Sequence, residues 1–249
     1  MSKKVLILSG SPRKGGNSDI LCDEFARGAQ EAGNEVDKIR VASKKIHPCS
    51  ACYYCRDHGG ACVHKDDMAD VLQKMIDADV LVLASPVYFY SIDAQLKAVI
   101  DRTVARWLEV KNKEFYYIVT MADEAHSSAD TTLACFRGYA DCVEGAVEKG
   151  VIIGSGVYEP GKVKNTLAMK QAYEMGKNAL PASAIILAVG IMIGTWLAAG
   201  TISTVLVFGL KVISPSIFLL VTMLLCSAVS LILGSSWGTV GTAGIAMMG

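Results

Sequence analysis

Short apolar runs alternate with stretches of helical periodicity through residues 1–180. Apolar runs bounded by turn residues predict buried strands, whereas apolar residues spaced three and four apart predict helices. The predicted strands cover residues 5–8, 35–41, 80–84, 115–120 and 151–157, and the predicted helices cover 19–26, 66–77, 95–108, 135–149 and 164–180. Strands that alternate with helices predict a doubly wound parallel α/β sheet. The strand at 35–41 alternates polar with apolar residues, which is typical of an edge strand.

Beyond residue 180 the pattern changes to long uncharged stretches. All 24 acidic residues and 23 of the 24 basic residues lie in 1–180, and Lys211 is the only charged residue in 181–249. Residues 184–209 and 216–233 are apolar runs long enough to cross a bilayer. We therefore predict a soluble α/β domain at 1–180, followed by a short pair of α-helical transmembrane segments within 181–249.

The lysines around the first apolar run predict on which side of the membrane the soluble domain lies. Lys162, Lys164, Lys170 and Lys177 precede the run, whereas the turn that follows it holds Lys211 alone. Because positively charged flanks remain in the cytoplasm, we expect the soluble domain on the cytoplasmic side of the membrane. The net charge of zero gives no sign of a nucleic-acid partner.

The strand-to-helix turn at residues 10–18 is rich in glycine and hydroxyl residues and carries Arg13. Backbone N–H groups at a helix start, assisted by hydroxyls and a cation, form a natural phosphate site. The turn holds neither the G-x-G-x-x-G pattern of dinucleotide sites nor the Gly-Lys-Ser/Thr end of a Walker A loop, and its alternative interpretation is a plain glycine turn. The loops at 85–90 and 121–126 follow two other strands. All of these loops fall at the carboxyl edge of the predicted sheet, where ligands of such folds bind.

A block of cysteines has the spacing Cys49-x2-Cys52-x2-Cys55-x6-Cys62. Thiolates packed this closely can hold one [4Fe–4S] cluster. Zinc is an alternative, although structural zinc sites usually use two separated pairs of ligands, and free thiols in a surface loop are a third. The flanking His47, His58 and His64 are expected to be solvated surface residues (the remaining cysteines of the soluble domain are expected to pack helices).

The segment Gly10-Ser-Pro-Arg-x-x-Gly-Asn-Ser18, together with Ser85-Pro-Val-Tyr88 and Gln95-Leu-Lys97…Asp101-Arg102, resembles the flavodoxin-like NADPH-dependent FMN reductases. The cysteine block resembles their iron–sulfur flavoprotein branch. The resemblance covers residues 1 to about 180 and implies a flavodoxin-like sheet with non-covalently bound FMN. The residues that it implies are Ser11, Arg13, Asn17 and Ser18 at the phosphate, Pro86, Val87, Tyr88 and Phe89 at the isoalloxazine ring, and Cys49, Cys52, Cys55 and Cys62 at a metal centre.

The same resemblance implies NAD(P)H as co-substrate, a redox partner or small-molecule electron acceptor, and a homo-oligomer. No catalytic acid–base residue is predicted, because a flavin carries the redox chemistry itself. For Tyr88, Phe89 and Tyr90, ordinary core packing is the alternative to contact with the ring.

Within 181–249, Gly194-Thr195-Trp196 and Gly234-Ser-Ser-Trp-Gly-Thr-Val-Gly-Thr242 resemble part of the NhaC-type sodium/proton antiporter family. The segment has neither a second repeat half nor an intramembrane Asp or Glu, so we do not expect transport by this chain alone. The leading hypothesis is therefore a membrane-tethered FMN-dependent oxidoreductase. Its alternatives are a fragment or subunit of an antiporter with a redox-sensing domain, and a non-catalytic electron-transfer flavoprotein.

Overall fold

The computed structural model describes residues 2–179, Thr195 and Ala199. The chain divides into two compact units, Ser2–Leu180 and Pro181–Gly249 with Met1, and the first of them is described below. The predicted spans at 184–209 and 216–233 lie outside the described residues, apart from Thr195 and Ala199. In the part of the chain that is described, no helix combines the length and the hydropathy needed to cross a bilayer.

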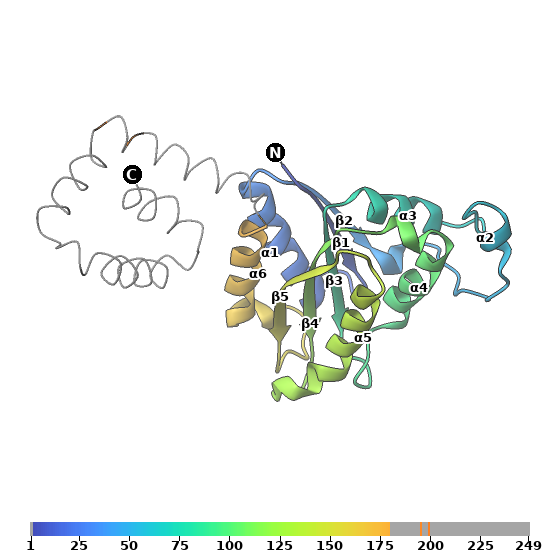
Figure 1. Ribbon diagram of the computed structural model, residues 1–249. Helices are drawn as coiled ribbons and strands as arrows, with labels where there is room; N and C mark the ends of the chain where they lie inside the picture. The colour runs from blue at the N-terminus through green and yellow to red at the C-terminus, as the bar shows by residue number, and fades with distance from the viewer. Residues whose placement is uncertain (1, 180–194, 196–198, 200–249) are drawn as a thin grey trace, which may run out of the picture. The chain divides into compact units, whose positions relative to one another are not determined.

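The core of the first unit is a parallel sheet with the strand order β2-β1-β3-β4-β5 (Figure 1). The strands are β1 (Lys4–Ser9), β2 (Glu35–Arg40), β3 (Val80–Pro86), β4 (Glu114–Thr120) and β5 (Val147–Gly154). This order is that of flavodoxin-like folds, in which the crevice between β1 and β3 is the switch point of the topology. The predicted parallel α/β sheet and the edge position of β2 are therefore confirmed.

The helices are α1 (Asn17–Glu31), α2 (Tyr54–Asp57), α3 (Met68–Asp77), α4 (Ala94–Arg102), α5 (Asp130–Asp141) and α6 (Leu167–Lys177). Apolar residues of α1 and α6 share one buried cluster with one face of the sheet, and those of α3, α4 and α5 share a second cluster with the opposite face. Helices on both faces bury both sides of β1, β3 and β4, which explains the nearly continuous apolar runs of these strands.

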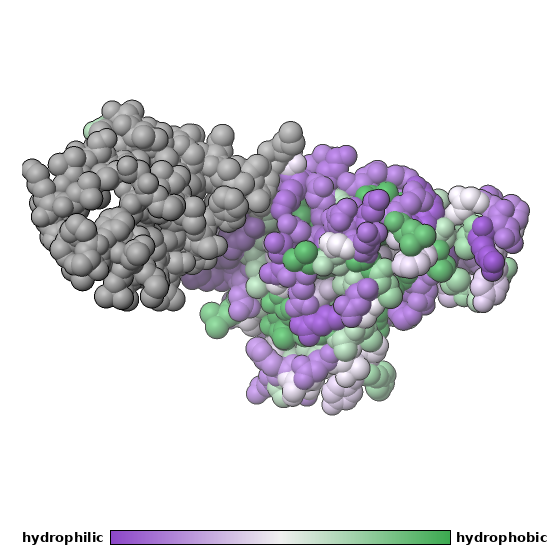
Figure 2. Space-filling model, viewed as in Figure 1, coloured by the Kyte–Doolittle hydropathy of each residue, from purple (hydrophilic) through white to green (hydrophobic). Residues whose placement is uncertain are grey.

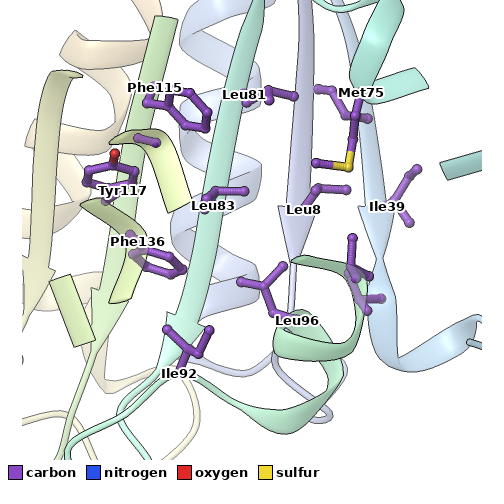
Figure 3. Packing of buried hydrophobic residues seen from close by; sticks show 14 of the residues in the cluster. Leu8, Ile39, Met75, Leu81, Leu83, Ile92, Leu96, Phe115, Tyr117 and Phe136 are labelled. Carbon is purple, nitrogen blue, oxygen red and sulfur yellow. The ribbon is translucent and has the colours of Figure 1, made fainter. Parts of the chain in front are cut away.

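Strand residues alternate between these two clusters. Figure 3 shows Leu8, Leu81 and Leu83 of the sheet with Met75 of α3 and Leu96 of α4 in the second cluster. Figure 2 shows hydrophilic residues spread over the visible face of the first unit, interrupted by smaller hydrophobic patches. The large apolar side chains are therefore gathered mainly under the helices.

Two of the predicted helices have wrong bounds. The helix predicted at 95–108 ends at Arg102 and continues as short 3-10 turns, where the Thr103 hydroxyl donates to the carbonyl of Ile100 at 2.7 Å and competes with helix continuation. The helix predicted at 135–149 is α5, which begins and ends earlier than predicted. Residues 147–149 instead begin β5, because Val147 and Glu148 pair with β4 before a register shift that skips Lys149.

Candidate functional site

The turn between β1 and α1 is held by its own backbone and by one acidic side chain. Gly10 N donates to the carbonyl of Ala84 in β3 at 2.8 Å, and Gly16 N donates to that of Arg13 at 3.1 Å. Gly15 adopts a φ of +67°, which glycine reaches without steric cost, and its N–H donates to Asp19 Oδ2 at 2.9 Å. The turn therefore folds directly onto the start of α1.

The first amides of α1 are available to a ligand. Those of Asn17 and Ser18 have no hydrogen-bond partner among the described residues, as expected for the first turn of a helix. These N–H groups and the positive end of the helix dipole favour an anion at this position. The Arg13 guanidinium, which lies 5.9 Å from the centre of the Tyr158 ring, adds a full positive charge.

Asp19 is a buried carboxylate close to this site, and basic residues of β2 compensate its charge. Its Oδ1 accepts from Lys38 Nζ at 2.8 Å, and its Oδ2 lies 3.7 Å from Arg40 Nε. Burial would raise the pKa of Asp19, but the hydrogen bonds and charges of Lys38, Gly15 and Arg40 outweigh it and hold the pKa below its ordinary value. Asp19 is therefore ionised, and its hydrogen bond from Gly15 N stabilises the turn. Because Lys38 and Arg40 compensate its negative charge, it repels a bound anion only weakly.

The polar side chains at the start of α1 join this turn to the ends of β4 and β5. Asn17 Nδ2 donates to the carbonyls of Val157 at 3.0 Å and Glu159 at 2.9 Å, while its Oδ1 accepts from Val163 N at 3.3 Å. The Ser18 and Thr120 hydroxyls lie 2.6 Å apart in a buried hydrogen bond. Both polar atoms of the Asn17 side chain therefore have hydrogen-bond partners in the protein, and its backbone N–H remains available to a ligand.

A cavity of about 180 Å³ opens at this edge of the sheet. The predicted residues that line it are Ser11, Arg13, Asn17, Ser18, Pro86, Val87 and Tyr88. Gly16, Met121 and Ala122 also line it and belong to the turn at 10–18 and the loop at 121–126 that were predicted at this edge. The lining residues that were not predicted are Thr120, Val157 and Tyr158. The turn after β1 and the loops after β3 and β4 meet here as expected, and a fourth segment after β5 joins them.

The aromatic loop after β3 is exposed, and contact of Phe89 with a flavin ring stays a prediction. Phe89 does not line the cavity and is fully exposed, with a relative accessibility of 102%. Tyr88 and Tyr90 are also exposed, so ordinary core packing of the three aromatics is wrong. Phe89 and Tyr90 have φ values of +49° and +62°, in a tight turn that is closed by hydrogen bonds between Tyr88 and Ser91.

Asp93 holds this loop to the start of α4. Its Oδ1 accepts from Leu96 N at 2.9 Å as a helix cap, and its Oδ2 accepts from the Ser85 hydroxyl at 2.8 Å. Burial raises the pKa of this carboxyl above its ordinary value. Gly10 faces it so closely that a Cβ there would lie 2.1 Å from Asp93 Oδ2. The close approach explains why the turn after β1 begins with glycine.

The cysteine block forms a second cavity, of about 340 Å³, at the side of α4. All four predicted ligands, Cys49, Cys52, Cys55 and Cys62, line it together with His64 and Arg102. The pKa of the Cys52 thiol is lowered by hydrogen bonds from the Tyr54 amide and the Ser50 hydroxyl. Among the described residues, no three Cys, His, Asp or Glu side chains are already arranged as metal ligands. Thiolates are the ligands that iron–sulfur groups take, and all four of these thiols line one cavity.

A buried ion pair anchors the cysteine block to the domain. Arg102 donates to both carboxylate oxygens of Asp66, at 2.9 and 3.0 Å, and to the carbonyl of His47 at 2.7 Å. Asp66 in turn accepts from His47 N at 2.9 Å and Met68 N at 3.2 Å. Burial would raise the pKa of Asp66, but Arg102 and these amides lower it to about 2. A larger cavity of about 760 Å³ adjoins this pair and shares Cys62 with the cysteine cavity.

The parallel sheet, the phosphate-type turn after β1 and the aromatic loop after β3 define a flavodoxin-like α/β protein. Residues 3–134 match the family described as NADPH-dependent FMN reductase. The chain therefore belongs to the family of NADPH-dependent FMN reductases.

Curated relatives of two kinds match the chain, each over a different fraction of its length. An iron–sulfur flavoprotein of Methanocaldococcus jannaschii is 42% identical over 100 residues, which are 40% of this chain and 51% of that protein. The chain thus spans about half the length of this relative. A malate-2H⁺/Na⁺-lactate antiporter of Bacillus subtilis is 55% identical over 71 residues, which are 28% of this chain and 15% of the antiporter.

Solved structures share the fold. An FMN-dependent NADH-azoreductase from Bacillus anthracis, solved in complex with FMN, superposes with a TM-score of 0.58 at 15% identity. The match covers 73% of this chain and 100% of that chain. The likeness at this identity concerns the arrangement of strands and helices.

Proposed function

We propose that the chain is an FMN-dependent oxidoreductase of the iron–sulfur flavoprotein kind, which oxidises NAD(P)H and passes electrons to a redox partner or a small-molecule acceptor. The observation that carries the proposal is the cavity at the sheet edge, because one phosphate-type turn and the loop after β3 line it together. The family membership and the similarity to curated iron–sulfur flavoproteins support the same function.

In this proposal FMN supplies the hydride and electron chemistry. The chain's own residues bind and orient it. The amides at the start of α1 and the Arg13 guanidinium bind the phosphate, with the Ser11 and Ser18 hydroxyls beside them. Pro86, Val87 and Tyr88 give the cavity an apolar wall for the ring.

The cysteine cavity is the proposed site of a [4Fe–4S] cluster, which would supply one-electron transfer. Cys49, Cys52, Cys55 and Cys62 would hold it, and the Asp66–Arg102 pair would keep their segment against α4. Zinc would fit the same thiols without redox chemistry, so iron and sulfide analysis separates the two.

The first test is the spectrum and the FMN affinity of the purified full chain. We expect a yellow protein that binds FMN, and Arg13→Gln should weaken binding about 10- to 150-fold, since a hydrogen bond to a charged group contributes about 1.5–3 kcal/mol. Lys14→Gln is the matched control, because Lys14 has the same charge in the same turn but does not line the cavity. A colourless protein that takes up no FMN would contradict the proposal.

Turnover separates the enzyme from a non-catalytic electron-transfer flavoprotein. The proposed enzyme oxidises NADH or NADPH in the presence of an acceptor, whereas the alternative binds FMN without turnover.

We further propose that the chain forms a homo-oligomer. Light scattering tests this proposal by measuring the molecular mass of the particle in solution.

We also propose that residues 181–249 tether the domain to a membrane, with the flavin cavity on the cytoplasmic side. The antiporter relatives support a membrane link. Recovery of the full-length chain in washed membranes is the expected result, and recovery in the supernatant would contradict it. Sodium-driven proton movement in everted vesicles that contain this chain would favour the antiporter alternative instead.

A further inference from the structure

Two buried nitrogen atoms of residues that line the cysteine cavity have no hydrogen-bond partner among the described residues. They are Nε of Arg102 and Nε2 of His64, and both residues line the cavity together with the four cysteines. A buried donor left unsatisfied costs about 1–3 kcal/mol. Arg102 Nε is always such a donor, and His64 Nε2 is one in the tautomer that carries its proton there. Both nitrogen atoms belong to residues that line one cavity with four thiols, so we look for their hydrogen-bond acceptor in this cavity.

The position of Arg102 is fixed by its other nitrogens. Nη1 and Nη2 are bound to Asp66, and Nη1 also donates to the carbonyl of His47. The side chain is almost completely buried, with a relative accessibility of 2%. Because this fork geometry is rigid, Nε cannot turn toward another acceptor without breaking the pair with Asp66.

His64 is oriented by a neighbouring ring. Its imidazole stacks on that of His47 with the ring centres 5.3 Å apart. The backbone of His47 is bound on both sides, to Asp66 and to Arg102. One connected set of side chains thus fixes both unpartnered nitrogens.

We propose that Arg102 and His64 are positioning residues that donate hydrogen bonds from Nε and Nε2 to the anionic iron–sulfur group held by the four cysteines, and thereby raise its reduction potential. The inference rests on the proposed function of this cavity. Donors and a fixed positive charge stabilise the reduced group, which is the more negative state, more than the oxidised group. Asp66 contributes by holding Arg102 in place.

The test is the midpoint potential of the iron–sulfur group in the full chain, measured by a dye-mediated spectroscopic titration. Arg102→Lys keeps the charge but removes Nε, and His64→Phe keeps a ring beside His47 but removes Nε2. For each variant we expect the ratio of reduced to oxidised group at a fixed potential to fall about tenfold, equivalent to about 59 mV for one electron.

Matched controls lie close by. Arg106→Lys changes a residue whose Nε already donates to Glu109 at 2.7 Å and which does not line the cysteine cavity. His58→Phe changes an exposed histidine of the same segment, stacked on Tyr54 with ring centres 3.6 Å apart. Both controls should leave the potential unchanged.

Each outcome has one meaning. Unchanged potentials in Arg102→Lys and His64→Phe, with iron and sulfide retained, would overturn the inference and leave the proposed function intact. A wild-type chain that binds FMN but no iron would instead overturn the proposed cluster, and the inference with it. Loss of iron from both variants with FMN retained would assign these residues to holding the segment rather than to setting the potential, and would also overturn the inference.

Discussion

The contact between α1 and α6 depends on two glycines, and replacing either with alanine should destabilise the protein. A Cβ at Gly28 would lie 2.2 Å from the carbonyl oxygen of Tyr173, and a Cβ at Gly176 would lie 2.1 Å from that of Phe25. Each new methyl group would also lie 3.0 Å from a backbone nitrogen of the opposite helix. Since these are backbone atoms, no side-chain rotation relieves the collision, and the helices must move apart.

The expected magnitude follows from two opposing contributions. Replacing glycine by alanine inside a helix ordinarily stabilises by about 1 kcal/mol. Overpacking a close contact ordinarily costs about 1–3 kcal/mol, and here both collisions involve rigid backbone. Separating α1 from α6 also loosens the cluster that both helices share with the sheet. The first two contributions alone leave a net loss of about 0–2 kcal/mol, and the looser cluster adds to it, so we expect each of Gly28→Ala and Gly176→Ala to lower the free energy of unfolding by about 1–2 kcal/mol.

The double variant and a control make this reasoning testable. Either substitution forces the same separation, so the double variant should cost less than the sum of the single ones by at least about 0.5 kcal/mol. Beyond its chain neighbours and its own helix backbone, Gly138 in α5 has no atom of the described residues within 4 Å of an added Cβ, so Gly138→Ala should stabilise by up to about 1 kcal/mol. Urea unfolding of the full chain, followed by circular dichroism, gives these differences from the midpoints. Stabilisation by Gly28→Ala equal to that by Gly138→Ala would refute the close contact.

Three further substitutions probe the candidate site. Gly10→Ala should lower the free energy of unfolding by about 2–4 kcal/mol, because it displaces the buried Asp93 cap, and the urea midpoint measures it. Asp66→Asn should cost about 3–5 kcal/mol at neutral pH by leaving Arg102 unpaired. The pKa of Asp66 is about 2 in the folded protein and about 4 in the unfolded chain, so the ion pair stabilises fully above pH 4. The difference in free energy of unfolding between wild type and Asp66→Asn should therefore shrink as the pH falls toward 2. A difference that stays constant over this range would contradict the lowered pKa. Phe89→Gly should leave the FMN affinity measured by isothermal titration unchanged, because the side chain is exposed and lies outside the cavity. The free energy of unfolding measured in urea should be unchanged or up to about 1 kcal/mol higher, because the φ of +49° suits glycine.

Much of the fold could be predicted because its signals are local. The apolar runs that became β1, β3 and β4 need only be buried on both faces to form strands, and their order along the chain restricts the topology. The ends of α4 and α5 were predicted less well. Their ends depend on a hydroxyl at Thr103 and on the pairing of Val147 and Glu148 with β4, which helical periodicity does not reveal.

The candidate site divides in the same way. The sequence by itself determined that a phosphate-type turn, an aromatic loop and a block of cysteines follow particular elements, because glycine, hydroxyl and thiol spacing is written along the chain. Only the tertiary structure decided that Asn17 is engaged by the segment after β5, that Phe89 lies outside the cavity, and that Arg102 reaches the cysteine block. The physical reason is distance along the chain: Asn17 and Val157 are 140 positions apart, and Arg102 and Asp66 are 36 apart. A hydrogen bond forms only between groups that folding brings to within about 3 Å of each other. No local sequence pattern encodes which distant groups meet in this way.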